Sequence, residues 1–106
     1  MTTHEYAGKP IDLGDDGFLV DADQWTKEVG EAIAAEVGIG PLGDRHWQVI
    51  DFCRKDASEK GGEAPGLRRI SKLSGVPMKE LYQLFPKGPG KLAAKIAGLP
   101  KPHACI

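Results

Sequence analysis

The sequence predicts a mainly α-helical fold: a small helical bundle with an N-terminal β-hairpin, a helix-turn-helix-like corner and a flexible C-terminal arm. Apolar residues recur at helical spacing between glycine and proline stops from residue 25 to residue 97, and two prolines interrupt the last eight residues. A chain of 106 residues with 41% hydrophobic residues is long enough for one modest core, which argues against two domains. We therefore expect one domain over residues 1–98 and an arm over residues 99–106.

The hairpin is the first predicted element. Two short alternating runs, residues 11–13 and 18–20, flank the sequence Gly-Asp-Asp-Gly at positions 14–17. Glycine and aspartate accept positive φ, so this segment is typical of a hairpin turn. We expect the two runs to pair as short antiparallel strands.

Two longer helices should follow. Asp23 or Thr26 can cap the first, which runs to about residue 37. Its apolar stripe repeats every four residues and consists of Trp25, Val29, Ile33 and Val37. Asp44 is the next candidate cap, and the second helix should end before the glycines at 61 and 62. Cys53 lies on the predicted inner side of this second helix.

The next segment predicts two short helices, residues 67–74 and 78–85, separated by Gly75-Val76-Pro77. The same spacing fits a DNA-binding helix-turn-helix, but base-reading side chains are scarce, with only Met78, Lys79 and Gln83 as candidates. We prefer an ordinary helical corner. Its expected core residues are Leu67, Ile70, Leu73, Val76, Leu81 and Leu84. A last helix over residues 91–97 should end at Gly98.

Charge is distributed unevenly along the chain. Residues 66–101 carry a net charge of +7, whereas the remainder carries −8. The basic segment either presents a cationic face to an acidic partner or is attracted to the acidic part of its own chain, and both alternatives stay open. The candidate partner-binding residues are Arg68, Arg69, Lys87, Lys91, Lys95 and Lys101.

Several classes of protein are excluded or disfavoured. No stretch approaches the roughly 18 apolar residues that a membrane span requires, and the first residues contain neither a basic leader nor an apolar run. We therefore expect a soluble protein of the cytoplasm, with no membrane partner. Two cysteines are too few for a disulfide framework.

The two thiols are expected to differ. Cys53 fits a packed, inert side chain. Cys105, one residue from the C-terminus on a proline-stiffened arm, should be accessible and is the candidate reactive thiol. In an extended arm the His103 side chain points to the same side as that of Cys105, two residues away. A Cys–His nucleophile pair also needs a third group that orients the imidazole, and the sequence offers none. The two residues also fall short of a zinc site, so we expect no metal and no cofactor.

Three segments near the C-terminus resemble one known family. They are Leu84-Phe85-Pro86-Lys87-Gly88-Pro89, Lys95-Ile96-Ala97-Gly98-Leu99-Pro100-Lys101-Pro102 and Cys105-Ile106. The resemblance to the DsrC/TusE sulfur-relay family extends less specifically upstream and covers nearly the whole chain. It implies a helical fold with an N-terminal hairpin and a mobile arm whose penultimate cysteine, here Cys105, carries sulfur as a persulfide.

One departure from the family pattern bears on function. Members that serve dissimilatory sulfite reductase have a second arm cysteine eleven residues before the last, and the matching residue here is Ala94. The resemblance therefore implies the single-cysteine, TusE-like role of passing sulfur between a donor complex and an acceptor protein, toward tRNA thiolation. Such a chain is a carrier more than a self-sufficient enzyme. An accessory subunit of sulfite reductase, a DNA-binding regulator and an unreactive scaffold subunit are the alternatives.

Overall fold

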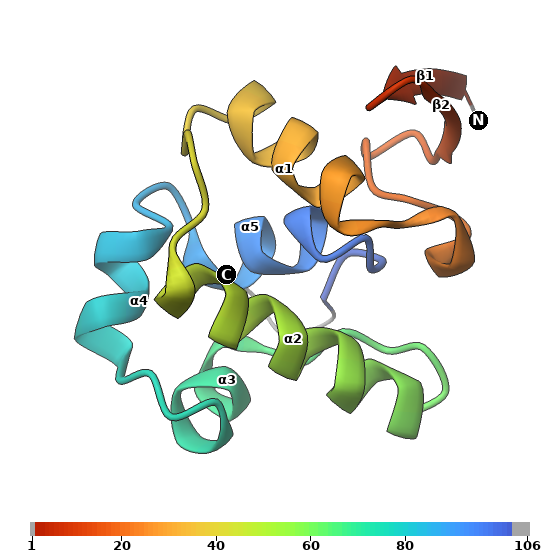
Figure 1. Ribbon diagram of the computed structural model, residues 1–106. Coiled ribbons are helices and arrows are strands. Elements are labelled where there is room, and N and C mark those ends of the chain that lie inside the picture. Colours follow the sequence, from red (N-terminus) through yellow and green to blue (C-terminus); the bar gives the residue numbers. More distant parts are fainter. Residues whose placement is uncertain (1, 103–106) are drawn as a thin grey trace.

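The computed structural model describes residues 2–102 and contains a two-stranded hairpin followed by a helical body (Figure 1). The elements in chain order are β1 (Thr2–Tyr6), β2 (Lys9–Leu13), the 3₁₀ turn η1 (Ala22–Gln24), α1 (Lys27–Glu36), α2 (Asp44–Glu59), α3 (Leu67–Leu73), α4 (Met78–Leu84) and α5 (Pro89–Ile96). The predicted fold class, mainly α with an N-terminal hairpin, is confirmed. None of the described helices is both long and apolar enough to cross a lipid bilayer.

The hairpin lies nearer the N-terminus than the sequence pattern indicated. β1 pairs antiparallel with β2 from Thr2 opposite Leu13 to Tyr6 opposite Lys9. Ala7 and Gly8 form the turn with φ of 54° and 77°, as a two-residue turn with positive φ at both positions requires. The predicted partner strand, residues 18–20, is wrong as a strand. It contributes only an isolated bridge between Leu13 and Leu19.

The two long helices begin and end close to their predicted limits. Thr26 caps α1, and its hydroxyl accepts a hydrogen bond from the Val29 amide at 3.2 Å. Asp23, the other candidate, lies instead in η1. Asp44 is the first residue of α2 and not its cap, because Gly43 takes the cap position and donates its amide to His46 Nδ1 at 3.1 Å.

The short helix α5 lies at the centre of the body, with α1 on one side and α2 on the other (Figure 1). The buried side chains that surround it form one continuous core. The largest enclosed side chains are Phe85, Ile11, Ile33, Ile50, Ile70, Leu81 and Ile96. Because α5 packs against four other helices, its alanines and glycine serve close packing, while Lys91 remains exposed.

The corner between α3 and α4 has the predicted form but not every predicted core residue. Gly75 has a φ of 84° at the turn, a conformation that glycine adopts without strain. Val76 and Leu81 are fully buried, as expected, whereas Leu73 is 53% exposed. The prediction for Leu73 was wrong because this residue ends α3 and its side chain points away from the core.

Candidate functional site at the root of the C-terminal arm

Cys105, the predicted reactive thiol, lies outside the described residues, as does its neighbour His103. The structure does describe the chain that leads to them, from α5 through Pro102. The candidate site is therefore built from the arm root, which we define as residues 96–99, and from the side chains that contact it.

The arm root begins with a helix stop that reverses the chain direction. Gly98 has a φ of 72° and donates its amide to the Lys95 carbonyl at 3.2 Å, while Leu99 donates to the Ala94 carbonyl at 3.0 Å. These two bonds form a Schellman motif, the common glycine-terminated end of a helix. Leu99 is only 3% exposed, so the first residue after the stop is held in the core.

Two side chains from distant segments bind the next two carbonyl groups. The Trp25 indole Nε1 donates to the Ile96 carbonyl at 2.7 Å, and Arg54 Nη1 donates to the Ala97 carbonyl at 2.7 Å. Helix C-termini leave carbonyls without intrahelical partners, and these are the ones that Trp25 and Arg54 satisfy. A cationic side chain at this end also complements the helix dipole.

The clamp residues, Trp25 and Arg54, also contact each other. The Arg54 guanidinium lies 4.2 Å from the centre of the Trp25 ring, and its Nη2 donates to the Ala22 carbonyl at 3.3 Å. Burial lowers the pKa of Arg54, although an arginine remains charged at neutral pH. Arg54 thus joins η1, the indole and the arm root in one unit.

The clamp requires glycine at two places. A Cβ on Gly98 would overlap the Trp25 ring, with Cγ only 2.7 Å away, and a Cβ on Gly30 would lie 3.1 Å from Nε1 and 3.2 Å from the Ile96 carbonyl oxygen. The indole therefore fits between two glycines, one on α1 and one in the arm root. This close fit fixes where the arm leaves the body.

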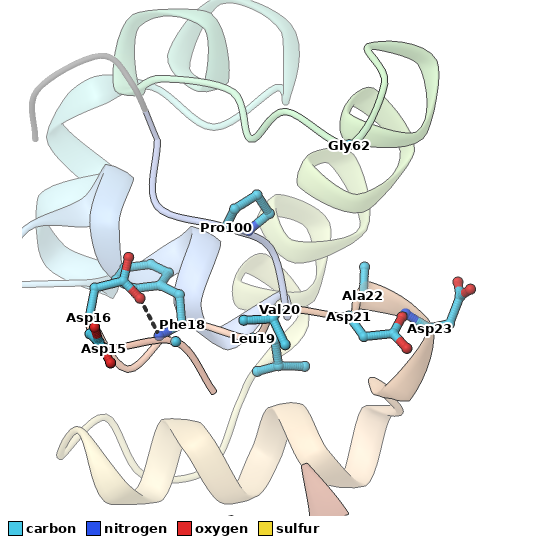
Figure 2. A pocket seen from close by; sticks show the side chains of 11 residues that line it. Asp15, Asp16, Phe18, Leu19, Val20, Asp21, Ala22, Asp23, Gly62 and Pro100 are labelled. Carbon is cyan, nitrogen blue, oxygen red and sulfur yellow. Dashed lines mark hydrogen bonds between the residues drawn. The ribbon is translucent and has the colours of Figure 1, made fainter. Parts of the chain in front are cut away.

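A groove of about 680 Å³ lies beside the arm root and includes Pro100 in its lining. Figure 2 shows Asp15 and Asp16 at one end of this groove and Asp21 and Asp23 at the other. The segment between them contains Val20, which is 54% exposed. The surface next to the arm is therefore acidic and partly apolar. The net positive charge of residues 66–101 had instead indicated a basic face as one of two alternatives.

The predicted basic residues do not form one cluster around the arm. Lys91 and Lys95 lie one turn apart on α5, and Lys95 Nζ is 5.9 Å from the centre of the Phe18 ring. Lys87, which precedes that helix in the sequence, and Lys101, which follows it, are both exposed, and Arg68 is exposed on α3. Their proposed role in partner binding stays a prediction.

Arg69 has a structural partner. Its guanidinium donates to both carboxylate oxygens of Asp56, with the shortest contact 2.7 Å from Nη2 to Oδ1. The Asp56 side chain is 4% exposed, and the hydrogen bonds from Arg69 lower the pKa of that carboxyl. At this position the basic segment is attracted to the acidic part of its own chain, one of the two alternatives for the charge pattern.

Cys53 is enclosed on α2, as predicted. Its side chain is 0% exposed, and burial raises the pKa of the thiol to about 12. Because the thiolate is the nucleophilic form of cysteine, this thiol is chemically inert in the folded chain. Ala94, which the family resemblance matches to a second arm cysteine, is likewise buried, at 1% exposure on α5.

Sequence reasoning missed the clamp. In the sequence Trp25 belongs to an apolar stripe and to the less specific upstream part of the family resemblance, and no pattern singles out Arg54. One signal was available, because a tryptophan that packs against a core needs an acceptor for its N–H group. Which carbonyl serves as that acceptor depends on tertiary packing across 71 residues of sequence. Within residues 2–102, no group of His, Cys, Asp and Glu side chains is arranged to hold a metal ion.

Comparison with known proteins identifies the family of the chain. The family model described as DsrC like protein matches residues 5–106. The chain is 45% identical over 106 residues, all of both proteins, to the gamma subunit of dissimilatory-type sulfite reductase from Nitratidesulfovibrio vulgaris. It is 41% identical to the sulfurtransferase TusE of Salmonella typhimurium over 95% of this chain and 97% of that protein.

A solved structure shows the same fold. A chain in the crystal structure of dissimilatory sulfite reductase I superposes with a TM-score of 0.86 at 41% identity and covers 99% of this chain and 100% of its own length. The family match spans nearly the whole sequence, and the relatives in both groups match along at least 97% of their own length. The chain therefore belongs to the DsrC-like protein family.

Proposed function

We propose that the chain is a cytoplasmic sulfur carrier of the TusE-like type, which accepts and donates persulfide sulfur on Cys105. The observation that carries the proposal is the state of the other thiol. The chain has two cysteines, and Cys53 is fully enclosed with a pKa of about 12. Sulfur chemistry at a cysteine of this chain therefore falls to Cys105, at the position where the family carries its penultimate cysteine.

The chemistry is a thiol exchange without net oxidation. The Cys105 thiolate attacks the outer sulfur of a donor persulfide, the sulfur–sulfur bond of the donor breaks, and the donor thiolate leaves. Cys105 then carries the persulfide. An acceptor thiolate attacks its outer sulfur in turn and releases Cys105 as a thiolate, so the carrier ends each cycle unchanged.

The TusE-like branch is favoured by Ala94. An intramolecular disulfide with Cys105 through this position is impossible without a cysteine there. A donor relay complex and a downstream acceptor protein are the proposed partners, and tRNA 2-thiouridine formation is the proposed destination of the sulfur.

Intact-mass measurement tests the carrier function directly. The native protein, Cys105→Ser and Cys53→Ala are each incubated with polysulfide or with persulfide-loaded rhodanese. We expect the native protein and Cys53→Ala to gain the mass of one sulfur atom, and Cys105→Ser to gain none. An adduct that persists without Cys105, or that disappears with Cys53, would overturn the assignment.

A second candidate function is that of a gamma-type accessory subunit of dissimilatory sulfite reductase. The 45% identity to such a subunit along the whole chain favours it. Size-exclusion chromatography with the purified catalytic subunits distinguishes the two functions. A stable complex that loads sulfur onto Cys105 during sulfite reduction would assign the chain to the reductase, whereas a TusE-like carrier remains separate.

A DNA-binding role has less support. The exposed candidates for base contacts on α4 are Lys79 and Gln83, while Glu80 of the same helix is bound to Arg45 by two hydrogen bonds of 2.7 Å. A DNA-binding module would show strongly salt-dependent binding to duplex DNA that survives Cys105→Ser. A sulfur carrier would not.

A further inference from the structure

The arm root is held more firmly than helix termination requires. Its Schellman bonds already satisfy the Ala94 and Lys95 carbonyls and would end α5 in an ordinary way. The structure adds the two side-chain donors of the clamp, on the carbonyls of Ile96 and Ala97. These are the last two carbonyls before the glycine that sets the direction of the departing chain.

The direction set at the arm root is transmitted along the next residues. Pro100 and Pro102 have φ fixed near −65°, and Leu99 and Lys101, which precede prolines, are restricted to extended conformations. Leu99 is buried and Pro102 is also buried, while Pro100 and Lys101 are exposed. Residues 99–102 therefore act as a stiff extension of the clamp.

We propose that Trp25 and Arg54 are positioning residues, which hold the arm root so that residues 99–102 present the Cys105 thiol in a restricted volume. This inference rests on the proposed function of Cys105. Both side chains act through the backbone carbonyls of the arm root.

Chain geometry gives the size of the expected effect. From Pro102 to Cys105 is three residues, a reach of about 10 Å, whereas from Leu99 it is six residues, a reach of about 20 Å. Doubling the reach enlarges the accessible volume about eightfold, which dilutes the thiol at a partner's pocket by the same factor. Loosening the clamp should therefore slow transfer between proteins by about tenfold.

Reaction of Cys105 with a small reagent is the control. A clamp that served only the stability of the fold would not slow protein-to-protein transfer selectively. Small reagents diffuse to the thiol wherever it lies, so their rate should not depend on the clamp. Iodoacetamide reports Cys105 alone as long as Cys53 stays enclosed. Transfer from persulfide-loaded rhodanese, in contrast, requires the thiol to enter a pocket.

Direct measurement of arm direction uses two nitroxide labels, at Glu31→Cys on α1 and Lys101→Cys in the arm, in a Cys105→Ser background. Both label positions are exposed. Pulsed electron–electron double resonance gives the distribution of distances between the two labels. We expect one narrow distribution in the parent protein and a width about twice as large in Trp25→Phe and Arg54→Met, because each loses one donor to the arm root.

Two further variants make the test selective. Arg54→Lys keeps one cationic donor and should recover most of the narrow distribution. Trp47→Phe changes a ring 6.5 Å from Trp25 that has no hydrogen bond to the arm root, and it should leave the distribution unchanged. Two measurements verify that each variant is folded: Cys53 must stay protected from labelling reagents, and the midpoint of urea unfolding must lie above the conditions of measurement.

The kinetic measurement uses the same two clamp variants, with Cys105 retained. We expect the second-order rate constant for sulfur transfer from rhodanese to fall about tenfold in Trp25→Phe and Arg54→Met, while alkylation by iodoacetamide stays unchanged. An unaltered distance distribution in folded Trp25→Phe and Arg54→Met would overturn the proposal. Equal slowing of both reactions would also overturn it. If native protein takes up no sulfur, the carrier function fails, and the distance distributions still decide whether the clamp directs the arm.

Discussion

The two ends of the described chain are attached to the helical body in different ways. The hairpin lies against the end of α1 with most of its side chains exposed, and Tyr6, Ile11 and Leu13 supply its buried contacts. The C-terminal segment is buried at Ala93, Ala94 and residues 96–99. Three side chains of the hairpin join the core, whereas the segment that leads to Cys105 is buried at six of the seven residues from 93 to 99.

The polar contacts of β1 and of the arm root differ in kind. The Tyr6 hydroxyl donates to Glu36 Oε1 at 2.7 Å, and His4 Nε2 lies 3.4 Å from Glu36 Oε2, so β1 is held by side chains. In β2 one backbone group is also bound, because the Asp12 amide donates to Gln24 Oε1 at 2.9 Å. At the other end Trp25 and Arg54 bind backbone carbonyls. A backbone contact fixes the path of the chain itself, and this is what a tail with a positioned thiol requires.

Glycine substitutions should show the largest difference between the two ends. Gly98→Ala places a side chain at a φ of 72° and against the Trp25 ring, which we expect to cost about 3 kcal/mol of unfolding free energy. Gly8→Ala in the hairpin turn meets no atom within 4 Å at a φ of 77°, so only backbone strain remains, about 1 kcal/mol. Urea unfolding measures both values. Equal losses would contradict the comparison.

Removing one hydrogen bond at each end should have a smaller effect. Trp25→Phe loses the donor to Ile96 and part of a packed ring, which we expect to cost about 2 kcal/mol. Tyr6→Phe loses only the hydroxyl bonded to Glu36, at a cost of about 1 kcal/mol. Thermal and urea unfolding supply the numbers. A larger loss for Tyr6→Phe would mean that the hairpin is the more strongly anchored end.

Alkaline solution should separate the body from the hairpin. Burial raises the pKa of the Cys53 thiol to about 12, and burial with the Glu36 hydrogen bond raises the pKa of Tyr6 above its ordinary value. The unfolded chain ionises cysteine near 8.5 and tyrosine near 10. Unfolding thus releases protons, and stability should fall by about 1.4 kcal/mol per pH unit above about pH 9 and more steeply above about pH 10.

Two variants assign the parts of that pH dependence. In urea unfolding between pH 8 and pH 11, Cys53→Ala should remove the decline that starts near pH 9, while Tyr6→Phe should remove only the additional decline above pH 10. An unchanged slope in Cys53→Ala would show that the thiol is less enclosed than the structure indicates.

Surface charges should produce the smallest change in stability. Lys91→Glu on α5 and Lys9→Glu on β2 both alter exposed side chains and should each shift stability by less than about 0.5 kcal/mol. If the basic residues near the arm steer a partner, only Lys91→Glu should lower the association rate with persulfide-loaded rhodanese, most clearly at low salt. Identical rates for the two variants would leave Lys91 as a solubilising residue.

Local patterns were sufficient for most of the helical body. The Gly75 turn and the inward position of Cys53 follow from spacing and side-chain type, and the structure confirms them. For the cap of α1 the sequence left Asp23 and Thr26 open, and the structure selects Thr26. The hairpin was misplaced because Ala7 carries the positive φ of a turn without being a residue that usually signals one. Leu73 was misassigned because apolar spacing does not reveal where a short helix ends relative to the core.

The site was less predictable than the fold. Family motifs pointed to Cys105 and to the arm, since the motif residues are adjacent in sequence. The clamp joins η1, α2 and the arm root through contacts that span 32 to 71 residues of sequence. Such contacts depend on how the helices pack, and neither periodicity nor charge counts contain that information.

The position of Trp25 gives the protein its own optical probe. Indole emission responds to its hydrogen bonding and to nearby charge, and this ring has both an acceptor in the arm root and the Arg54 guanidinium above its face. Trp47 is the only other tryptophan, so its replacement by phenylalanine leaves a single emitter. Fluorescence of that variant would follow displacement of the tail by a docking protein in real time, without any attached dye.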